Sequence, residues 1–195
     1  MSRLSRIYQE IVDDPANAAV GTAGYLPLYT AAPAARIVII GQAPGKRAQE
    51  SRKPWNDPSG DKLRSWLGVT DEEFYDPKLI ALLPMDFYYH GKGDHGDLPP
   101  RKEFAPKWHP RILAELPHRR LTILIGSYAQ NYYLRDRLKP NLTQTVKAYQ
   151  EYLPDIIPLV HPSPLNFRWQ TRNPWFESDV IPVLQERVRA ALGSA

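Results

Sequence analysis

The stretch Arg36–Gly45, RIVIIGQAPG, predicts a buried β-strand that runs directly into a ligand-binding loop. Its β-branched run is typical of a parallel strand that is covered on both faces. The glycines and the proline that follow let the backbone approach a ligand and hold its N–H groups in set directions. Because ligands bind at the carboxyl ends of parallel strands, Gly41–Gly45 lies where a site is expected.

A second strand ends in the same way near the end of the chain. The stretch Asp155–Asn166, DIIPLVHPSPLN, passes from an apolar run into a loop stiffened by two prolines. A histidine at a strand end, here His161, can donate a hydrogen bond to a negative charge that develops on a substrate oxygen. We expect both loops to converge on one cleft, with Leu165 exposed at the tip of the second loop.

The order of apolar and amphipathic segments predicts the fold class. Strands are expected at residues 36–40, 79–84, 121–125 and 156–160, and helices at residues 5–12, 60–67, 105–116, 127–138, 143–149 and 175–192. A capping box, Thr70 to Glu73, starts one further helical turn. Residues 13–35, 41–59 and 86–104 are expected to be loops. Strands that alternate with helices indicate a three-layer α/β fold with a central four-stranded parallel sheet flanked by helices, in one domain over residues 1–195.

The composition narrows the class of protein. The chain has no cysteine, which excludes disulfides, cysteine-ligated zinc and thiolate-bound iron–sulfur clusters. Its net charge is +4 and its pI about 9.2, which is compatible with a polyanionic partner. No apolar run approaches the length of a membrane span, so we expect a cytoplasmic protein with no membrane partner.

The two loops resemble the signature motifs of the uracil-DNA glycosylase superfamily. The first motif of that family is similar to G-Q-D-P-Y or G-E-A-P-G, and the second to H-P-S-P-L. Gly41–Gly45 and His161–Leu165 match them in the same order, and a weaker resemblance extends from Arg36 to Glu177. The resemblance implies a DNA repair enzyme without a cofactor. Such an enzyme hydrolyses the N-glycosidic bond of uracil, or of another deaminated base, after flipping it out of the duplex.

The resemblance also implies roles for individual residues. His161 would stabilise the anion of the leaving base, Trp55 would stack on the base, and Leu165 would fill the gap that the flipped nucleotide leaves. The remaining base-binding residues would be Gly41, Gln42, Ala43, Pro44, Gly45 and Met85. The remaining DNA-binding residues would be Ser163, which would hold a phosphate, and Pro164, Asn166 and Arg168.

The chain departs from the family at the acid that activates water. Well-known branches carry it in the first motif, where this chain has Gln42 and Ala43, and neither side chain can act as a general base. Asp86 and Asp57 are the two candidates. We favour Asp86, because it follows a strand directly, whereas Asp57 has a ready structural role as a helix cap. The family's base-reading asparagine is missing near Asp86, so the base preference stays open.

Other readings of the sequence remain. The chain could be a glycosylase-fold protein that binds DNA or a modified base without turnover, or an α/β enzyme that acts on a free nucleotide. Spacing argues against a metal site at His90, His95, Asp97 and His109. A basic stretch that begins at Arg101 is either a solvated face or a phosphate-contacting strip. The expected partner is double- or single-stranded DNA with a damaged base. The protein is expected to be a monomer, associated with the nucleoid if it is bacterial.

Overall fold

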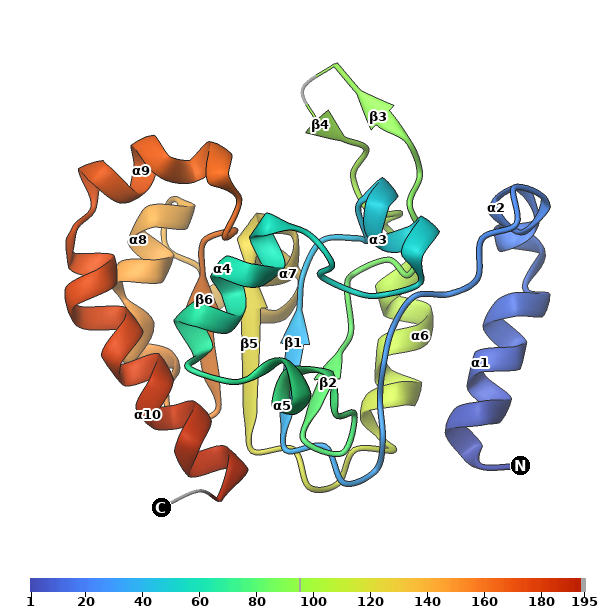
Figure 1. Ribbon diagram of the computed structural model, residues 1–195, viewed down its shortest axis with the longest axis horizontal. Helices are drawn as coiled ribbons and strands as arrows, with labels where there is room; N and C mark the ends of the chain where they lie inside the picture. The colour runs from blue at the N-terminus through green and yellow to red at the C-terminus, as the bar shows by residue number, and fades with distance from the viewer. Residues whose placement is uncertain (95, 194–195) are drawn as a thin grey trace.

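Four parallel strands form the central sheet that the apolar runs predict. The computed structural model describes residues 1–94 and 96–193. The strands of the sheet are β1 (Ile37–Ile40), β2 (Ile80–Leu82), β5 (Leu121–Ile125) and β6 (Ile156–Leu159). Their order is β2-β1-β5-β6, and each neighbouring pair is parallel (Figure 1). The predicted fold class is confirmed, and β1 lies inside the sheet with a strand on each side.

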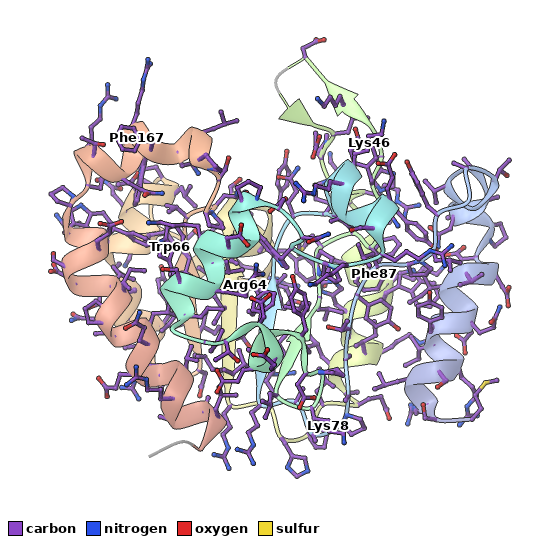
Figure 2. The ribbon with its side chains drawn as sticks, in the orientation of Figure 1. Lys46, Arg64, Trp66, Lys78, Phe87 and Phe167 are labelled. Atoms are coloured by element: carbon purple, nitrogen blue, oxygen red, sulfur yellow. The ribbon has the colours of Figure 1, made fainter. Side chains whose placement is uncertain are left out.

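Alternate residues of β1 pack against opposite layers of helices. Ile37 and Ile39 belong to one core, and the helices of that face are α4 (Pro58–Leu67), α5 (Asp71–Tyr75), α8 (Leu142–Lys147) and α10 (Ile181–Leu192). Val38 and Ile40 belong to a second core, and its helices are α1 (Arg3–Asp13), α6 (Phe104–Leu113) and α7 (Gly126–Leu134). Side chains fill the space on both sides of the sheet (Figure 2). Because a strand presents successive side chains to opposite faces, a wholly apolar run requires two covered faces.

Local sequence signals explain where two of the helices begin. The Asp57 carboxylate accepts a hydrogen bond from the Gly60 N–H at 2.9 Å, and Pro58 is the first residue of α4. The predicted capping box is present at the start of α5. There Thr70 accepts from the Glu73 N–H at 3.2 Å, and Glu73 accepts from the Thr70 N–H at 2.8 Å.

Several short elements lie in segments that were expected to be loops or had no expected structure. They are the 3₁₀ turn Pro15–Asn17, α2 (Ala18–Thr22), α3 (Lys46–Ser51), α9 (Phe167–Arg172) and a hairpin of β3 (Lys92–Gly93) and β4 (Gly96–Asp97). Further 3₁₀ turns cover Arg135–Arg137, Tyr149–Tyr152 and Pro164–Asn166. The last predicted helix is divided, because a π-helical segment, Phe176–Val180, precedes α10. Each of these short helices, turns and strands has too few residues for an apolar period to stand out in the sequence.

Several of the short elements, α3, α9 and the β3–β4 hairpin among them, lie beyond the carboxyl ends of the strands. Figure 1 shows the β3–β4 hairpin rising above this edge, with α3 at its base, and α9 above the β6 end of the same edge. Within residues 1–94 and 96–193, no helix is both long and apolar enough to cross a bilayer. The edge with the added loops and helices is therefore the place to look for a site.

Candidate functional site

A cavity of about 400 Å³ opens at the carboxyl ends of the strands. Most of its wall is made by the loop after β1, the segment that leads into α4, the segment after β2, and the loop after β6, and Leu28, Ala48, Asp97 and Leu98 complete it. Gly41–Gly45, Trp55, Asp57, His90 and His161 all line it. The two motif loops therefore converge, as their positions after parallel strands predict.

The loop after β1 continues the hydrogen bonding of the sheet beyond the ends of the strands. The carbonyl of Gly41 accepts from the N–H of Met85 at 2.8 Å, and the carbonyl of Gln42 accepts from the N–H of Asp86 at 3.1 Å. The side chain of Gln42 donates to the carbonyl of Leu98, at the base of the hairpin, at 3.4 Å. These bonds fix the loop against the segment after β2, so its shape does not depend on a ligand.

Trp55 occupies the cavity wall in a backbone conformation that tryptophan rarely adopts. Its φ is 55°, in the left-handed region. A Cβ on Gly60 would overlap the carbonyl oxygen of Trp55, and a Cβ on Gly41 would lie 2.9 Å from Cζ2 of its ring. The hydroxyl of Tyr75 donates to the same carbonyl at 3.4 Å. Two glycines are thus needed to hold the indole in place, and strain of this kind concentrates at functional sites.

Gly41→Ala should destabilise the fold by about 1–3 kcal/mol, because the new methyl group must displace the Trp55 ring. Urea unfolding measures the loss. Gly21→Ala is the matched control, since a Cβ there meets nothing within 4 Å and Gly21 lies within α2. The control should be neutral or slightly stabilising, because alanine favours helix. Equal stability of the two variants would contradict the tight packing of Trp55 on Gly41.

His161 is held as a neutral imidazole in a single tautomer. Its Nδ1 accepts a hydrogen bond from the N–H of Ser163 at 3.1 Å, so Nδ1 carries no proton and Nε2 is the ring's donor. Burial lowers the pKa of His161, although the charge of Asp57 opposes this effect. The ring lies 5.7 Å from that of Trp55, measured between centroids. An Nε2–H donor therefore faces a cavity that has an indole beside it.

The rest of the loop after β6 projects away from the sheet. Leu165 lines the cavity, yet 92% of it is exposed. Ser163 accepts from the N–H of Leu165 at 3.2 Å, and Asn166 donates to the carbonyl of His161 at 2.7 Å. Phe167, labelled on α9 in Figure 2, is 70% exposed. Hydrogen bonds within the loop thus hold an apolar side chain out in solvent.

Other residues predicted to bind DNA or a base lie farther from the cavity. Pro164 and Arg168 are exposed and do not line it, and Asn166 acts on the backbone of its own loop. Met85 is buried behind the cavity wall in the second core. The roles predicted for these residues stay predictions, and the structure does not bring them to the cavity.

Asp57 and Asp86, the two predicted acids, lie in different environments. Asp57 lines the cavity and is partly exposed, and its helix-capping bond engages only Oδ1. Its charge also acts on His161, so the two groups are near each other. A carboxylate in this position can orient a water molecule and stabilise a cation.

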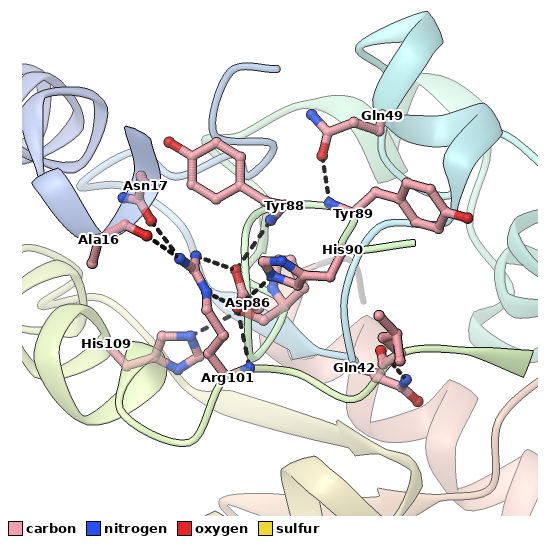
Figure 3. A network of polar contacts seen from close by, with 12 residues as sticks. Ala16, Asn17, Gln42, Gln49, Asp86, Tyr88, Tyr89, His90, Arg101 and His109 are labelled. Atoms are coloured by element: carbon pink, nitrogen blue, oxygen red, sulfur yellow. Dashed lines mark hydrogen bonds and ion pairs between the residues drawn. The ribbon is translucent and has the colours of Figure 1, made fainter. Parts of the chain in front are cut away.

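The structure does not place Asp86 in the cavity, contrary to the sequence-based expectation. Asp86 is fully buried, and Oδ2 accepts from the Nε of Arg101 at 2.8 Å while Oδ1 accepts from its Nη2 at 3.0 Å. The backbone N–H groups of Tyr88 and Arg101 also donate to it, both at 3.2 Å (Figure 3). Burial raises the pKa of Asp86, but contacts with His90 and Arg101 outweigh burial and hold it below its usual value. Asp86 is thus an anion enclosed by donors.

His90 also lines the cavity. The sequence predicted no role for it, because it was considered only as a metal ligand and its spacing argued against a metal site. Nε2 of His90 lies 2.8 Å from Oδ2 of Asp86. The signal was absent because a single histidine in a polar loop has no pattern. His95, also weighed as a ligand, lies outside the described residues. Within the described chain, no group of three histidine, cysteine or acidic side chains is placed to hold a metal.

Comparison with known proteins gives one family. A model of the Uracil DNA glycosylase superfamily matches residues 28–185. Among solved structures, the chain is similar to the solution NMR structure of a candidate uracil DNA glycosylase from Methanosarcina acetivorans. The sequences are 15% identical, the match covers 83% of this chain and 98% of that chain, and the TM-score is 0.48. Residues 28–185 include every residue that lines the cavity.

Proposed function

Because this chain belongs to the uracil DNA glycosylase superfamily, we propose that it hydrolyses the N-glycosidic bond of uracil, or of another deaminated base, in DNA. One observation carries the proposal: His161, fixed as an Nε2–H donor, and the Trp55 ring lie together in a cavity at the end of the sheet. A base inside a duplex cannot reach such a cavity, so the nucleotide must be flipped out of the stack.

The chemistry is a displacement at the sugar. The bond between C1′ and the base nitrogen breaks, the base takes the electron pair, and the oxygen of a water molecule forms the new bond to C1′. His161 would donate to the oxygen on which the charge of the base develops, and backbone N–H groups of the loop Gly41–Gly45, which lines the same cavity, would assist it. The water gives a proton to a carboxylate, and the base anion is later protonated from solvent.

Asp57 is the carboxylate that best fits this role. It lines the cavity near His161, whereas both oxygens of Asp86 are occupied by buried donors. The charge of Asp57 would also stabilise the oxocarbenium-like sugar. We therefore assign the water-orienting role to Asp57 in place of Asp86.

The test is incubation with oligonucleotides that carry uracil, hypoxanthine or xanthine, followed by alkali cleavage at the abasic site. We expect strand cleavage with at least one of the three, in single- or double-stranded DNA, and none with the unmodified oligonucleotide. Cleavage that survives in the double variant His161→Ala, Asp57→Asn would point to a contaminating enzyme. If none of the three bases is released while damaged DNA is still bound, the glycosylase assignment fails.

A binding protein without turnover is the second candidate function. One observation favours it: Gln42 and Ala43 provide no carboxylate in the loop after β1, although both line the cavity. Under this alternative, DNA with a flipped damaged base would be bound tightly and released unchanged. The cleavage assay together with a gel-shift measurement separates the two functions.

Leu165→Ala should slow excision from a uracil–adenine pair about tenfold more than excision from single-stranded DNA. An exposed leucine such as Leu165 would fill the gap in the stack, and a single strand needs little unstacking. Single-turnover rates on the two substrates measure the difference. Leu26→Ala is the control, because Leu26 is 41% exposed but does not line the cavity. Equal losses on both substrates would contradict a role for Leu165 as a wedge.

A further inference from the structure

The cavity contains a second imidazole, and neither the family motifs nor the proposed chemistry assigns it a task. His90 lies in the segment after β2, and 14% of its side chain is exposed. Its Nε2 atom is buried and lies 2.8 Å from Oδ2 of Asp86. The contact is close but poorly aligned for a hydrogen bond, as contacts in ligand-free sites often are. The ring therefore spans the space between a buried carboxylate and the cavity.

The partner of His90 is itself held from several directions. Arg101 grips Asp86 with two side-chain N–H groups and one backbone N–H. The other end of the guanidinium donates from Nη1 to the carbonyl of Ala16 at 2.9 Å and to the side chain of Asn17 at 2.8 Å (Figure 3). The Asp86 carboxylate thus has a fixed position, and it fixes the neighbouring His90 ring in the cavity wall.

This arrangement fixes which nitrogen of His90 carries a proton. A carboxylate can only accept, so the Nε2 atom that faces Asp86 must be the protonated one. In the uncharged form of the ring, which leaves the Asp86–Arg101 pair balanced, Nε2 holds the only proton. The remaining nitrogen, Nδ1, is then an acceptor. It has no hydrogen-bond partner among residues 1–94 and 96–193.

We propose that His90 reads the base: Nδ1 accepts a hydrogen bond from the ring N–H of a deaminated base. This rests on the proposed function, because it requires a flipped base in the cavity. Uracil has a proton on N3 and hypoxanthine on N1. Cytosine and adenine carry a lone pair at the corresponding nitrogen, and two lone pairs facing each other repel. A histidine acceptor in the cavity wall therefore separates deaminated bases from their parents.

Binding of free bases tests this without any turnover. The probes are uracil, 3-methyluracil and cytosine, with hypoxanthine and 1-methylhypoxanthine as the purine pair, titrated by calorimetry. We expect the wild-type protein to bind uracil about tenfold more tightly than 3-methyluracil or cytosine. Each of these two bases lacks the N–H group and therefore loses one hydrogen bond to a buried site. His90→Ala should bind uracil about tenfold more weakly and lose the discrimination. His118→Ala, at an exposed histidine outside the cavity, should match the wild type.

Asp86→Asn tests whether the position of the proton on His90 sets the base preference, which a merely structural role of His90 would not affect. An asparagine amide can donate to Nε2, which would put the proton of His90 on Nδ1 and turn that atom into a donor. The ratio of uracil to cytosine binding should then fall below that of the wild type. Because this variant leaves Arg101 without its anion, thermal unfolding must show that it is folded. His90→Ala leaves the Asp86–Arg101 pair intact and remains informative if Asp86→Asn does not fold.

The outcomes separate this inference from the proposed function. If uracil and 3-methyluracil bind equally to the wild-type protein, or if His90→Ala keeps the full ratio, the base-reading role is overturned even when damaged DNA is cleaved. If no damaged base is released but the ratio depends on His90, the reading role stands and the glycosylase assignment fails. If neither uracil nor hypoxanthine shows saturable binding at millimolar concentration, the inference is also overturned.

Discussion

Asp57→Asn should lower the single-turnover rate of base excision by about 10²- to 10⁴-fold, the value of a positioned general base. DNA affinity should change little, because Asp57 lies in the cavity wall and a carboxylate does not attract a phosphate. The amide keeps the shape of the side chain and can still accept from the Gly60 N–H, so α4 keeps its cap. The measurement is a rapid-quench time course with enzyme in excess over a uracil-containing oligonucleotide.

Asp57→Ser separates catalysis from capping. Serine is as good an N-cap as aspartate but provides no charge, so it should be as slow as the asparagine variant and nearly as stable as the wild type. Asp61→Asn, at an exposed acid within α4, should keep the wild-type rate. Should Asp57→Asn excise at the wild-type rate while a folded Asp86→Asn is inactive, the acid is Asp86, as the sequence alone favoured.

His161→Ala should slow excision by about 10²- to 10³-fold, or about 3–4 kcal/mol, as expected on removal of one preorganised donor to a developing anion. The loss should be smaller for 5-fluorouracil, because its anion needs less stabilisation when it leaves. The lowered pKa of His161 adds a pH signature. Because burial lowers the pKa of His161, any loss of rate caused by protonation of the ring should appear at a pH below the usual titration of histidine.

The control for His161 is Ser163→Ala, which leaves intact the backbone N–H that fixes the tautomer. This variant should lose little in the chemical step, and any loss should be in DNA affinity. A His161→Ala protein that loses as much on 5-fluorouracil as on uracil would contradict leaving-group stabilisation. The ring would then have another task, such as support of the Trp55 indole.

The fold could be predicted because its main elements have strong local signals. The β-branched runs that became β1 and β6 are wholly apolar, and the capping box at Thr70 is a pattern that depends on four neighbouring residues. In contrast, α3 and α9 have six residues each, and the strands of the hairpin have two. Segments of that length cannot show a period, and tertiary contacts decide their structure.

The candidate site was predictable only where backbone and residue type together determine position. Glycine and proline in Gly41–Gly45, and the strand end before His161, fixed two walls of the cavity. The state of Asp86 depends on Arg101, which comes later in the chain and was assigned to a basic surface strip. A charge whose partner is distant in sequence has no local signature, and its burial could not be foreseen.

The order of the strands has a consequence for how the protein folds. Trp55 and His161 lie beside each other in the cavity wall, yet more than half of the chain lies between them in sequence. Contacts of such high sequence separation form only after the loop-closure entropy of the intervening segments has been overcome. The β1–β2 pair joins segments that are close in sequence, whereas β6 pairs with β5 and α10, at the end of the chain, packs on α4 and β1. We therefore expect the cavity to be completed late, after a refolding chain has gained most of its secondary structure.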